Sequence, residues 1–478
     1  MTTEVVRKLD RLLNPRSVAV VGDKRQTNYM WLHSMSTFQG RVYSVQVDRR
    51  EVEGIEAMGV PNYASLLEIP GEVDYVLVAV PRAVAPRIVG DCIAKGVGGC
   101  TLFTSGFAET GQEEGVRLQE ELRRMAVAAG LALVGPNCMG VYNPRLGLRH
   151  SPDQPAGESG NVGFISQSGT HATFFSLVGA RQGVRISKSV SFGNAVVLDV
   201  SDYLEYMAQD GETEVIAMYV EGVRDGRRFL RTLRETAKRK PVVVWKGGQT
   251  EAGHRAIYSH TASLASGTAV WEAAMRQCGA VSVDSLDEAI DAVKALLYAR
   301  AGTGKRMGLI AMTGGQSVII TDAFARAGLA VLPLTDASYE RLADFFNVIG
   351  GSYRNPLDAG GTIAMGGEPL NLQRLLDILD EDENVDAMAL EVSVGFLARR
   401  WQQDPALLDR MLGIIADLRA QSAKPLVVIV QPLHLEALAA EVRSRVQGLD
   451  VPAFGGFQQA ALALRRAIDY GRFRAGMD

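Results

Sequence analysis

One unit repeats along this chain and constrains its fold more than any other feature: a short apolar run, a turn, and a stretch with helical periodicity. Four of the apolar runs in the first 150 residues are 17–21, 42–47, 74–80 and 131–134. Continuous apolar runs of this length are typical of parallel strands that helices cover on both faces. Because helical patterns at 83–95 and 113–129 separate them, these residues predict a doubly wound α/β domain.

The same unit occurs in two later segments that resemble each other. A strand expected at 160–165 leads into a Ser-Gln-Ser-Gly turn, and one expected at 306–312 leads into Thr-Gly-Gly-Gln-Ser. A helical pattern follows each turn, so both segments are built on one plan. The chain is therefore predicted to be α/β, with a Rossmann-like domain followed by two flavodoxin-like parallel-sheet domains. The expected bounds of the three domains are 1–145, 158–300 and 305–478.

Composition excludes several classes of protein. The chain has 478 residues, a formal net charge of −4 and a sequence pI of about 6.0, so no basic field indicates nucleic-acid binding. No apolar stretch reaches the ~20 residues of a membrane span, and residues 1–14 lack the apolar core of a signal peptide. The four cysteines form no CxxC pair and are Cys92, Cys100, Cys138 and Cys278. We therefore expect a cytoplasmic protein that binds neither nucleic acid nor membrane.

Two strand-to-helix turns have the residue types of a phosphate site. In each, small residues place free backbone N–H groups and the positive end of a helix at a common point. The residues are Ser166, Gln167, Ser168 and Gly169 in one turn, and Gly314, Gly315 and Gln316 in the other. Each turn taken alone is more often an ordinary tight turn of an α/β domain, since such turns are common at the carboxyl edge of these sheets. Their recurrence in two similar segments favours phosphate binding.

His260 is the candidate reactive side chain. It is one of six histidines and lies between Ser259 and Thr261. An imidazole can act as nucleophile or base near neutral pH, although a structural histidine is the more common case. Glu221 ends an expected strand, where its carboxylate can hydrogen-bond one imidazole nitrogen or lie in solvent. His254 is a weaker competitor because charged residues surround it.

The first domain has three turns after strands that face one edge of its sheet. The first of them contains Gly22, Lys24 and Arg25, whose cationic side chains can bind phosphates or simply be exposed. It is not a GxGxxG fingerprint, which argues against ordinary dinucleotide binding, and Asp48 is the one acidic candidate for a ribose ligand. The residues expected to surround a ligand in the other two turns are Ser105, Gly106, Phe107 and Asn137.

Taken in order, these motifs resemble one family. They are Asn14-Pro-Arg-Ser-Val-Ala-Val-Val-Gly22, Ser105-Gly-Phe, Gly135-Pro-Asn-Cys-Met-Gly140, Ser166-Gln-Ser-Gly169, Glu221-Gly and Ser259-His-Thr. The pattern is similar to the nucleoside-diphosphate-forming acyl-CoA synthetases, most of all to the α subunit of the ADP-forming acetyl-CoA synthetases and more distantly to succinyl-CoA synthetase. The resemblance covers nearly the whole chain.

The resemblance implies an acid–thiol ligase that converts acyl-CoA, phosphate and ADP into a carboxylic acid, CoA and ATP. An acyl phosphate would phosphorylate His260, and Glu221 would orient that imidazole. The two phosphate turns would hold the phosphoryl group. Coenzyme A would bind to the first domain, at Gly22, Lys24, Arg25, Ser105, Gly106, Phe107 and Asn137. ADP or ATP with Mg would bind to an ATP-grasp β-type subunit, so a hetero-oligomer is expected and this chain itself would hold no metal.

The sequence also differs from the family pattern near the histidine. Ala262 and Ser266 stand where the family has glycine, and the turn at 22–31 lacks the family's small glycine-rich form. These differences motivate an alternative, a CoA-binding or acyl-CoA-binding scaffold or sensor without ligase activity. A third hypothesis, an NAD-dependent oxidoreductase, depends on the Rossmann-like first domain alone.

Overall fold

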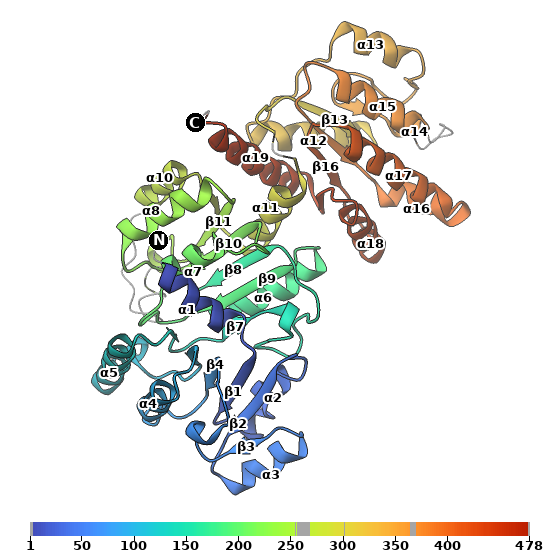
Figure 1. Cartoon of the computed structure of the whole chain (residues 1–478). Coiled ribbons are helices and arrows are strands. Elements are labelled where there is room, and N and C mark those ends of the chain that lie inside the picture. The colour runs from blue at the N-terminus through green and yellow to red at the C-terminus, as the bar shows by residue number, and fades with distance from the viewer. Residues whose placement is uncertain (1–2, 254, 256–267, 301, 364–369, 477–478) are drawn as a thin grey trace. The chain divides into compact units, whose positions relative to one another are not determined.

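The computed structural model describes residues 3–253, 255, 268–300, 302–363 and 370–476. The chain divides into two compact units, Met1–Ala289 and Ile290–Asp478 (Figure 1). The first unit holds two six-stranded sheets, and the second unit holds one five-stranded sheet. Within the described ranges, no helix combines the length and the apolar character that crossing a bilayer requires.

The first sheet is parallel throughout, in the order β3-β2-β1-β4-β5-β6. Its strands are β1 (Ser17–Val21), β2 (Arg41–Val45), β3 (Asn62–Tyr63), β4 (Tyr75–Val78), β5 (Gly99–Leu102) and β6 (Leu133–Val134). This is the order of a doubly wound Rossmann-type sheet, whose switch point lies between β1 and β4. The four expected strands are confirmed. β3 and β5 have no counterpart among them, because β3 is two residues long and β5 (Gly-Cys-Thr-Leu) is not a continuous apolar run.

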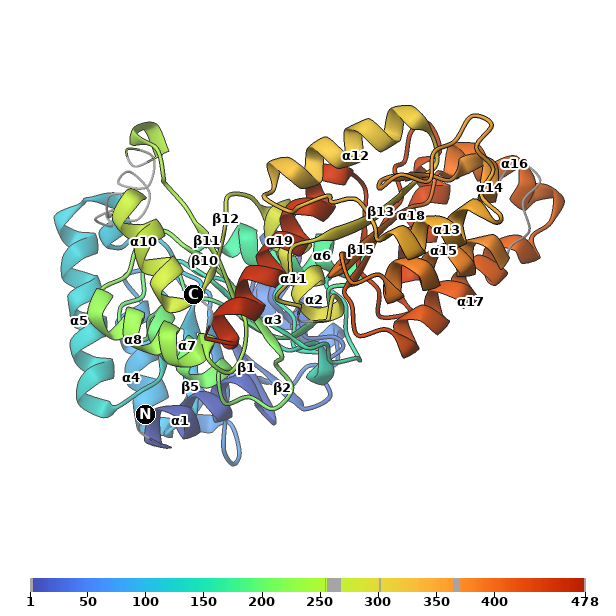
Figure 2. The ribbon, with the colours of Figure 1, turned by 90° about the horizontal axis from the view of Figure 1, so that it is seen from above.

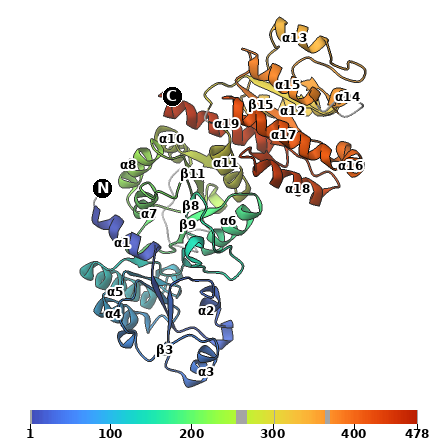
Figure 3. The same cartoon turned by 45° about the vertical axis from the view of Figure 1, so that its right-hand side comes forward.

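Helices cover both faces of the first sheet. The elements are α1 (Thr3–Leu13), α2 (Met30–Ser34), α3 (Arg49–Ala57), α4 (Ala85–Lys95) and α5 (Glu113–Ala129), with 3-10 turns η1 (Arg25–Thr27), η2 (Leu66–Glu68), η3 (Ala108–Thr110) and η4 (Pro144–Leu146). α2 and α3 lie on one side of the sheet, and α4 and α5 lie on the other (Figure 1, Figure 3). Alternate strand residues, such as Val21, Val76 and Val78, pack with α4 and α5 in one core.

The second sheet has the order β12-β11-β10-β8-β9-β7. Its strands are β7 (Gly140–Tyr142), β8 (Val162–Ser166), β9 (Ile186–Ser191), β10 (Val215–Val220), β11 (Val242–Lys246) and β12 (Val281–Val283). Numbered from β8, the five parallel strands follow the flavodoxin order 2-1-3-4-5. β7 adds an antiparallel edge by pairing with β9. The helices are α6 (Gly169–Arg181), α7 (Val200–Met207), α8 (Gly226–Ala237), α10 (Thr268–Cys278) and α11 (Leu286–Tyr298).

The third sheet repeats this order as β14-β13-β15-β16-β17. Its strands are β13 (Met307–Ala311), β14 (Leu357–Asp358), β15 (Ala387–Glu391), β16 (Leu426–Ile429) and β17 (Ala453–Phe454). Its helices are α12 (Gly314–Arg326), α13 (Asp336–Ala343), α14 (Gly360–Ile363), α15 (Leu370–Glu381), α16 (Val394–Gln403), α17 (Ala406–Gln421), α18 (Glu436–Gln447) and α19 (Phe457–Arg474). The predicted likeness of the two flavodoxin-like domains is therefore confirmed.

The third sheet separates two hydrophobic cores. Along β13, Leu309 faces the core that contains α12 and α19, and Ile310 faces the core that contains α15 and α17. The two pairs of helices lie on opposite sides of the strands (Figure 1, Figure 2). Because successive strand residues point to opposite faces, a sheet covered on both sides needs apolar residues at every position. This requirement explains the continuous apolar runs in the sequence.

Candidate active site

Three neighbouring strands of the second sheet end together. Tyr219 of β10 is in register with Ser166 of β8 and with Trp245 of β11. The next residues along these strands therefore reach the same carboxyl edge, because parallel strands in register end side by side. Gln167, Glu221 and Lys246 lie at this edge. The structure thus brings two residues expected at the site, Gln167 and Glu221, next to each other.

The first phosphate turn is held by its own hydroxyl groups. Ser166 is fully buried, and its Oγ accepts from the N–H of Ser168 at 3.2 Å and donates to the carbonyl of Ser168 at 2.7 Å. The Ser168 side chain caps α6 by accepting from the N–H of His171 at 3.4 Å. The N–H groups of Gly169 and Thr170 have no acceptor within the described ranges. Two free donors at the positive end of a helix are the local condition for holding phosphate.

The Gln167 side chain fixes the backbone at Glu221. Its Oε1 accepts from the N–H of Glu221 at 2.7 Å and from that of Gly222 at 3.1 Å. The Glu221 residue is 7% exposed. Its Oε1 accepts from the Tyr219 hydroxyl at 3.2 Å, whereas its buried Oε2 has no partner in the described part of the chain. One carboxylate oxygen is therefore left for a donor such as an imidazole N–H.

A histidine that the sequence analysis did not single out lies beside Glu221. His171, the third residue of α6, packs with Tyr219 and Trp245 in a cluster of three rings, at centroid distances of 4.4 Å and 4.5 Å. Burial lowers the pKa of His171, and the Glu221 charge opposes that shift. Its Nδ1 is buried, and no described residue is its partner. The sequence feature that could have identified this residue is its position in the first turn of the helix that follows the phosphate turn.

The expected phosphoryl carrier lies outside this description. His260 belongs to the residues that the structure does not describe, as do Ala262 and Ser266. Its role, and its pairing with Glu221, therefore stay predictions.

The second phosphate turn has a different charge environment. Thr313 caps α12 by accepting from the N–H of Gln316 at 3.3 Å, and Gln316 Nε2 donates to Gln431 at 3.1 Å. Gly314 and Gly315 begin the helix, as expected for an open N-terminus. Two buried acids border this turn, however, and the sequence analysis did not anticipate them. They are Asp358 and Glu391, at 8% and 2% exposure.

The two acids work against an anion at the second turn. Glu391 accepts from the N–H of Met312 at 2.9 Å, and the buried Asp358 Oδ1 has no partner within the described ranges. Burial raises the pKa of both carboxyl groups, and the Asp358 charge raises that of Glu391 further. In their charged form they repel phosphate, so the second turn is a weaker candidate than the first.

The turn after β1 begins with a glycine that the packing requires. Gly22 has φ +87°, and a Cβ there would come within 2.7 Å of the Val80 side chain. Lys24 and Arg25 are exposed, and the Arg25 backbone N–H donates to Glu51 at 2.7 Å. The Arg25 guanidinium also donates to the carbonyl of Arg50 at 3.2 Å, so its part in binding CoA stays a prediction. Arg82, just after β4, is a further cation at the switch point, and its Nη1 donates to Gly106 O at 2.7 Å.

The turn after β5 is largely occupied by the protein itself. The Glu109 carboxylate accepts from the N–H groups of Gly106 and Phe107, at 2.6 Å and 3.1 Å. The Phe107 side chain is fully buried in the core of the first domain. Ser105 is exposed, and its hydroxyl is the group of this turn that a ligand can reach. Asn137, in the left-handed region at φ 59°, bonds the Thr104 carbonyl through its N–H at 3.0 Å, which brings the two turns together.

A polar hollow of about 480 Å³ adjoins the first turn. Thr27 and Asn28 from the turn, His33 from α2, and Arg149 are among the residues that line it. Arg149 is 8% exposed and bonds carbonyl and hydroxyl oxygens, among them the Ser36 Oγ at 3.2 Å. Burial lowers its pKa. The hollow supplies polar donors next to the expected CoA turn.

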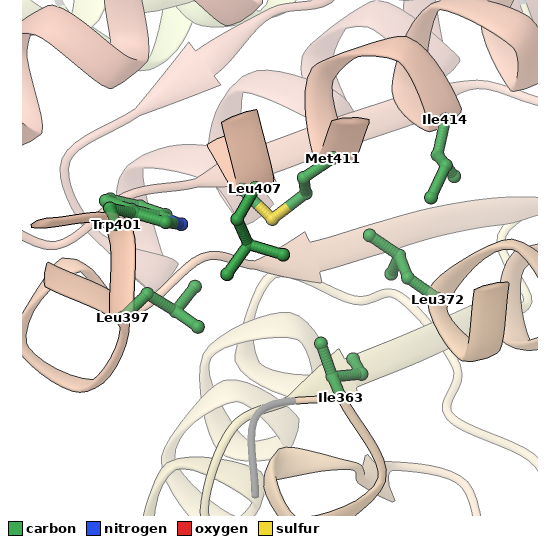
Figure 4. Close-up of a pocket in the computed structure, with 7 residues that line it drawn as sticks. All are labelled: Ile363, Leu372, Leu397, Trp401, Leu407, Met411 and Ile414. Atoms are coloured by element: carbon green, nitrogen blue, oxygen red, sulfur yellow. The ribbon is translucent and has the colours of Figure 1, made fainter. Parts of the chain in front are cut away.

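The other notable pocket is apolar and lies in the third domain (Figure 4). Its cavity volume is about 20 Å³, and it is lined by Ile363, Leu372, Leu397, Trp401, Leu407, Met411 and Ile414. The indole nitrogen of Trp401 is buried without a hydrogen-bond partner. The lining offers no titratable or nucleophilic group, so this pocket is a packing feature of the α16 and α17 region. Within the described ranges, no group of three or more His, Cys, Asp or Glu residues could hold a metal ion.

Comparison with known proteins assigns both halves of the first unit. A model of the CoA-binding domain matches residues 16–144, and a model of the succinyl-CoA-ligase-like flavodoxin domain matches residues 159–296. The chain is 37% identical over 382 residues to an ADP-forming acetate–CoA ligase (I) of Archaeoglobus fulgidus, covering 79% of this chain and 54% of the relative. It is 35% identical to the α subunit of acetate–CoA ligase II of Pyrococcus furiosus, covering 80% and 81%.

A solved structure agrees over the whole length. The dinucleotide-forming acetyl-coenzyme A synthetase 1 of Ca. Korarchaeum cryptofilum, determined with phosphate and ADP, matches with a TM-score of 0.83 and 28% identity. The match covers 98% of each chain. This chain thus spans about half the length of the Archaeoglobus relative and about four fifths of the Pyrococcus α subunit.

Proposed function

This chain belongs to the ADP-forming acyl-CoA ligase family, and we propose that it is the α-type subunit of such a ligase. The α-type role is supported by two relatives named as α subunits, of which the match covers 81% and 77%. The partner is an ATP-grasp β-type subunit that binds ADP or ATP with Mg. The two subunits form a hetero-oligomer in the cytoplasm.

The reaction runs in three balanced steps. A phosphate oxygen attacks the thioester carbonyl, the C–S bond breaks, and CoA leaves with a proton as the free thiol. The acyl phosphate then transfers its phosphoryl group to an imidazole nitrogen of His260, and the carboxylate leaves. Finally the phosphohistidine transfers the phosphoryl group to the terminal phosphate of ADP on the partner, which forms ATP and restores the imidazole.

The observation that carries this proposal is the free oxygen of Glu221. Its Oε1 is occupied by Tyr219, its backbone is held by Gln167, and its buried Oε2 has no partner among the residues that the structure describes. A carboxylate that accepts one imidazole N–H makes the other nitrogen the nucleophile and stabilises the cation formed on phosphorylation. The free N–H groups of Gly169 and Thr170 hold the phosphoryl group.

Coenzyme A binds at the carboxyl edge of the first sheet. Lys24 and Arg25 meet its phosphates, and Ser105 and Asn137 approach it from the neighbouring turns. The matched CoA-binding domain at 16–144 supports this location. The acyl group is open, because relatives are named for acetate, 4-hydroxybutyrate and trans-ferulate. Acetyl-CoA is the first substrate to test.

Labelling tests the proposal directly. The chain is incubated with acetyl-CoA, or with feruloyl-CoA, and ³²P-labelled phosphate. The expected product is labelled protein whose label is stable in base and labile in acid, and which ADP and the partner subunit discharge as labelled ATP. His260→Asn abolishes the label, whereas the matched variant His254→Asn keeps it. Full labelling of the His260 variant would remove that residue from the mechanism.

The same experiment decides the alternative. A scaffold or sensor binds CoA in calorimetry yet takes up no label with either acyl-CoA and makes no ATP with the partner. The sequence differences at Ala262 and Ser266 are the reason to include this arm. Glu221→Gln keeps the shape and the hydrogen bond from Tyr219 but removes the charge, and we expect about tenfold to a thousandfold slower phosphorylation.

A further inference from the structure

The turn at the start of α12 presents hydrogen-bond donors and a free acceptor side by side. Within the described ranges, the N–H groups of Gly314 and Gly315 have no acceptor, and both residues are exposed. Asp358 ends β14 and is 8% exposed, and no described residue is a partner of its Oδ1. A buried oxygen without a partner is costly unless a ligand brings a hydrogen-bond donor to it.

The Asp358 carboxylate lies directly beside the first residue of the helix. A Cβ placed on Gly314 would come within 3.2 Å of Asp358 Oδ2, whereas one placed on Gly315 would meet no described atom within 4 Å. The turn therefore has open space next to its free N–H groups and a carboxylate at its side. A ligand that accepts from these N–H groups comes to lie next to that carboxylate.

The corresponding position of the second domain carries a neutral group. β9 holds the place in the second sheet that β14 holds in the third, and it ends in Ser191. A Cβ placed on Gly169 would lie 3.7 Å from the Ser191 Oγ, as one on Gly314 would lie 3.2 Å from Asp358. A hydroxyl can donate to any anion, whereas an ionised carboxylate only accepts. The two phosphate turns thus share their free N–H groups and differ in this neighbour.

An acceptor beside an anion distinguishes anions by the proton that they carry. Near neutral pH, inorganic phosphate keeps at least one O–H, and sulfate keeps none. The phosphate O–H can donate to Asp358 while the other phosphate oxygens accept from the helix, whereas sulfate leaves the carboxylate unpaired. Repulsion from Asp358 and Glu391 acts on both anions, so the proton decides between them.

We propose that Asp358 is a specificity-determining residue of the second turn, where it accepts the O–H of phosphate and rejects anions that carry no proton. This inference rests on the proposed function, because it takes the anion to be the inorganic phosphate of the ligase reaction. Sulfate resembles phosphate in size and shape but cannot form the acyl phosphate. A site that bonds an O–H rejects an analogue without it far more strongly than a difference in shape would.

A bound cation and a shared proton are the competing explanations for two buried acids at one turn. A divalent cation between Asp358 and Glu391 would satisfy both carboxylates. A proton already held by the pair would let Asp358 donate to an anion. In both cases phosphate and sulfate bind alike, so the preference between these two anions separates the proposal from its competitors.

Titration of the full chain with phosphate and with sulfate near neutral pH tests the proposal. Calorimetry measures the affinities, and hydrogen–deuterium exchange locates each anion. Phosphate is expected to protect peptides covering 313–318 and to bind there at least about tenfold more tightly than sulfate. Peptides covering 166–172 are the internal control, because the turn beside Ser191 is expected to be protected by both anions.

Two variants change the neighbour of Gly314. Asp358→Asn keeps the shape and supplies a donor, so sulfate is expected to protect 313–318 with an affinity within about threefold of that of phosphate. Asp358→Ser gives the second turn the hydroxyl of the first and has the same expected result. The matched control is Asp382→Asn, since Asp382 is also buried but precedes β15 and accepts from the Thr335 N–H at 2.9 Å. It is expected to keep the preference of the wild type.

Three results would overturn the proposal: no protection of 313–318 by phosphate, equal protection by sulfate in the wild type, or an unchanged preference in both Asp358 variants. Selective phosphate binding without ³²P labelling from acyl-CoA would instead reject the proposed ligase function and leave the Asp358 site standing. Labelling of the wild type without a preference at 313–318 would reject the role of Asp358 and keep the ligase function.

Discussion

Gln167 offers a sharp test of the site because two isosteric changes separate its roles. One side-chain oxygen accepts the N–H groups of Glu221 and Gly222, at 2.7 Å and 3.1 Å. Gln167→Leu removes the acceptor and leaves both donors unpaired. A buried unpaired N–H costs roughly 1–3 kcal/mol. Because Gln167 and Gly222 are partly exposed, we expect a total of about 1–3 kcal/mol for the pair.

Gln167→Glu keeps the acceptor and adds a charge. Its carboxylate accepts both N–H groups, so the backbone at Glu221 stays in place. Two unit charges about 6 Å apart, at an effective dielectric constant of about 20, repel by about 3 kcal/mol. A phosphate on the free N–H groups of α6 is therefore expected to bind at least about tenfold more weakly.

Two measurements on the same proteins give the result. Hydrogen–deuterium exchange of peptides covering 215–224 is expected to speed up about tenfold to a hundredfold in Gln167→Leu and to stay unchanged in Gln167→Glu. Phosphate titration is expected to weaken in both. Unchanged exchange in Gln167→Leu would show that Gln167 does not hold this backbone. Wild-type phosphate affinity in Gln167→Glu would refute a phosphate site at the turn.

Three further changes test charge and packing elsewhere. His150 is 1% exposed, and burial lowers its pKa to about 3. Its contribution to the free energy of unfolding is therefore fully present above pH 6.5 and is lost as the pH falls toward 3. His150→Asn should flatten acid unfolding in that range, by up to about 1.4 kcal/mol per pH unit. Burial raises the pKa of Glu391 above its ordinary value of about 4.5. At a pH above that value, keeping this carboxyl group charged in the folded state lowers the free energy of unfolding. Glu391→Gln should raise the unfolding midpoint at pH 7 and not at pH 4. Trp401→Phe removes an unpartnered donor and should change stability by less than about 1 kcal/mol, against about 2–5 kcal/mol for the buried Leu376→Ala.

Urea unfolding at several pH values decides all three. An equal acid slope in wild type and His150→Asn would mean that other groups control acid unfolding. Stabilisation by Glu391→Gln at pH 4 as well as at pH 7 would exclude the charge as its cause. A loss in Trp401→Phe as large as in Leu376→Ala would mean that the indole N–H is not the uncompensated group.

The fold could be predicted from the sequence because strands that are buried on both faces form continuous apolar runs. Strands such as 17–21 and 215–220 are apolar at every position, so their existence and order could be recognised without contacts. The family followed from motifs that each occupy a few consecutive residues. Short strands such as β3 and β14 were not predicted, since two residues form a strand by pairing with a longer neighbour and have no periodicity of their own.

Of the candidate site, the sequence determined the turns and tertiary structure decided their surroundings. The Ser-Gln-Ser-Gly turn and Glu221 were found because a strand end and a helix start are local properties. That Gln167 holds Glu221, and that Lys246 donates to the carbonyl of the same residue, depends on which strands are neighbours, and residues 167, 221 and 246 are far apart in the chain. The acids Asp358 and Glu391 came to the second turn in the same way. The chemistry of a turn follows from consecutive residues, whereas the net charge at a site comes from residues on several strands that only folding brings together.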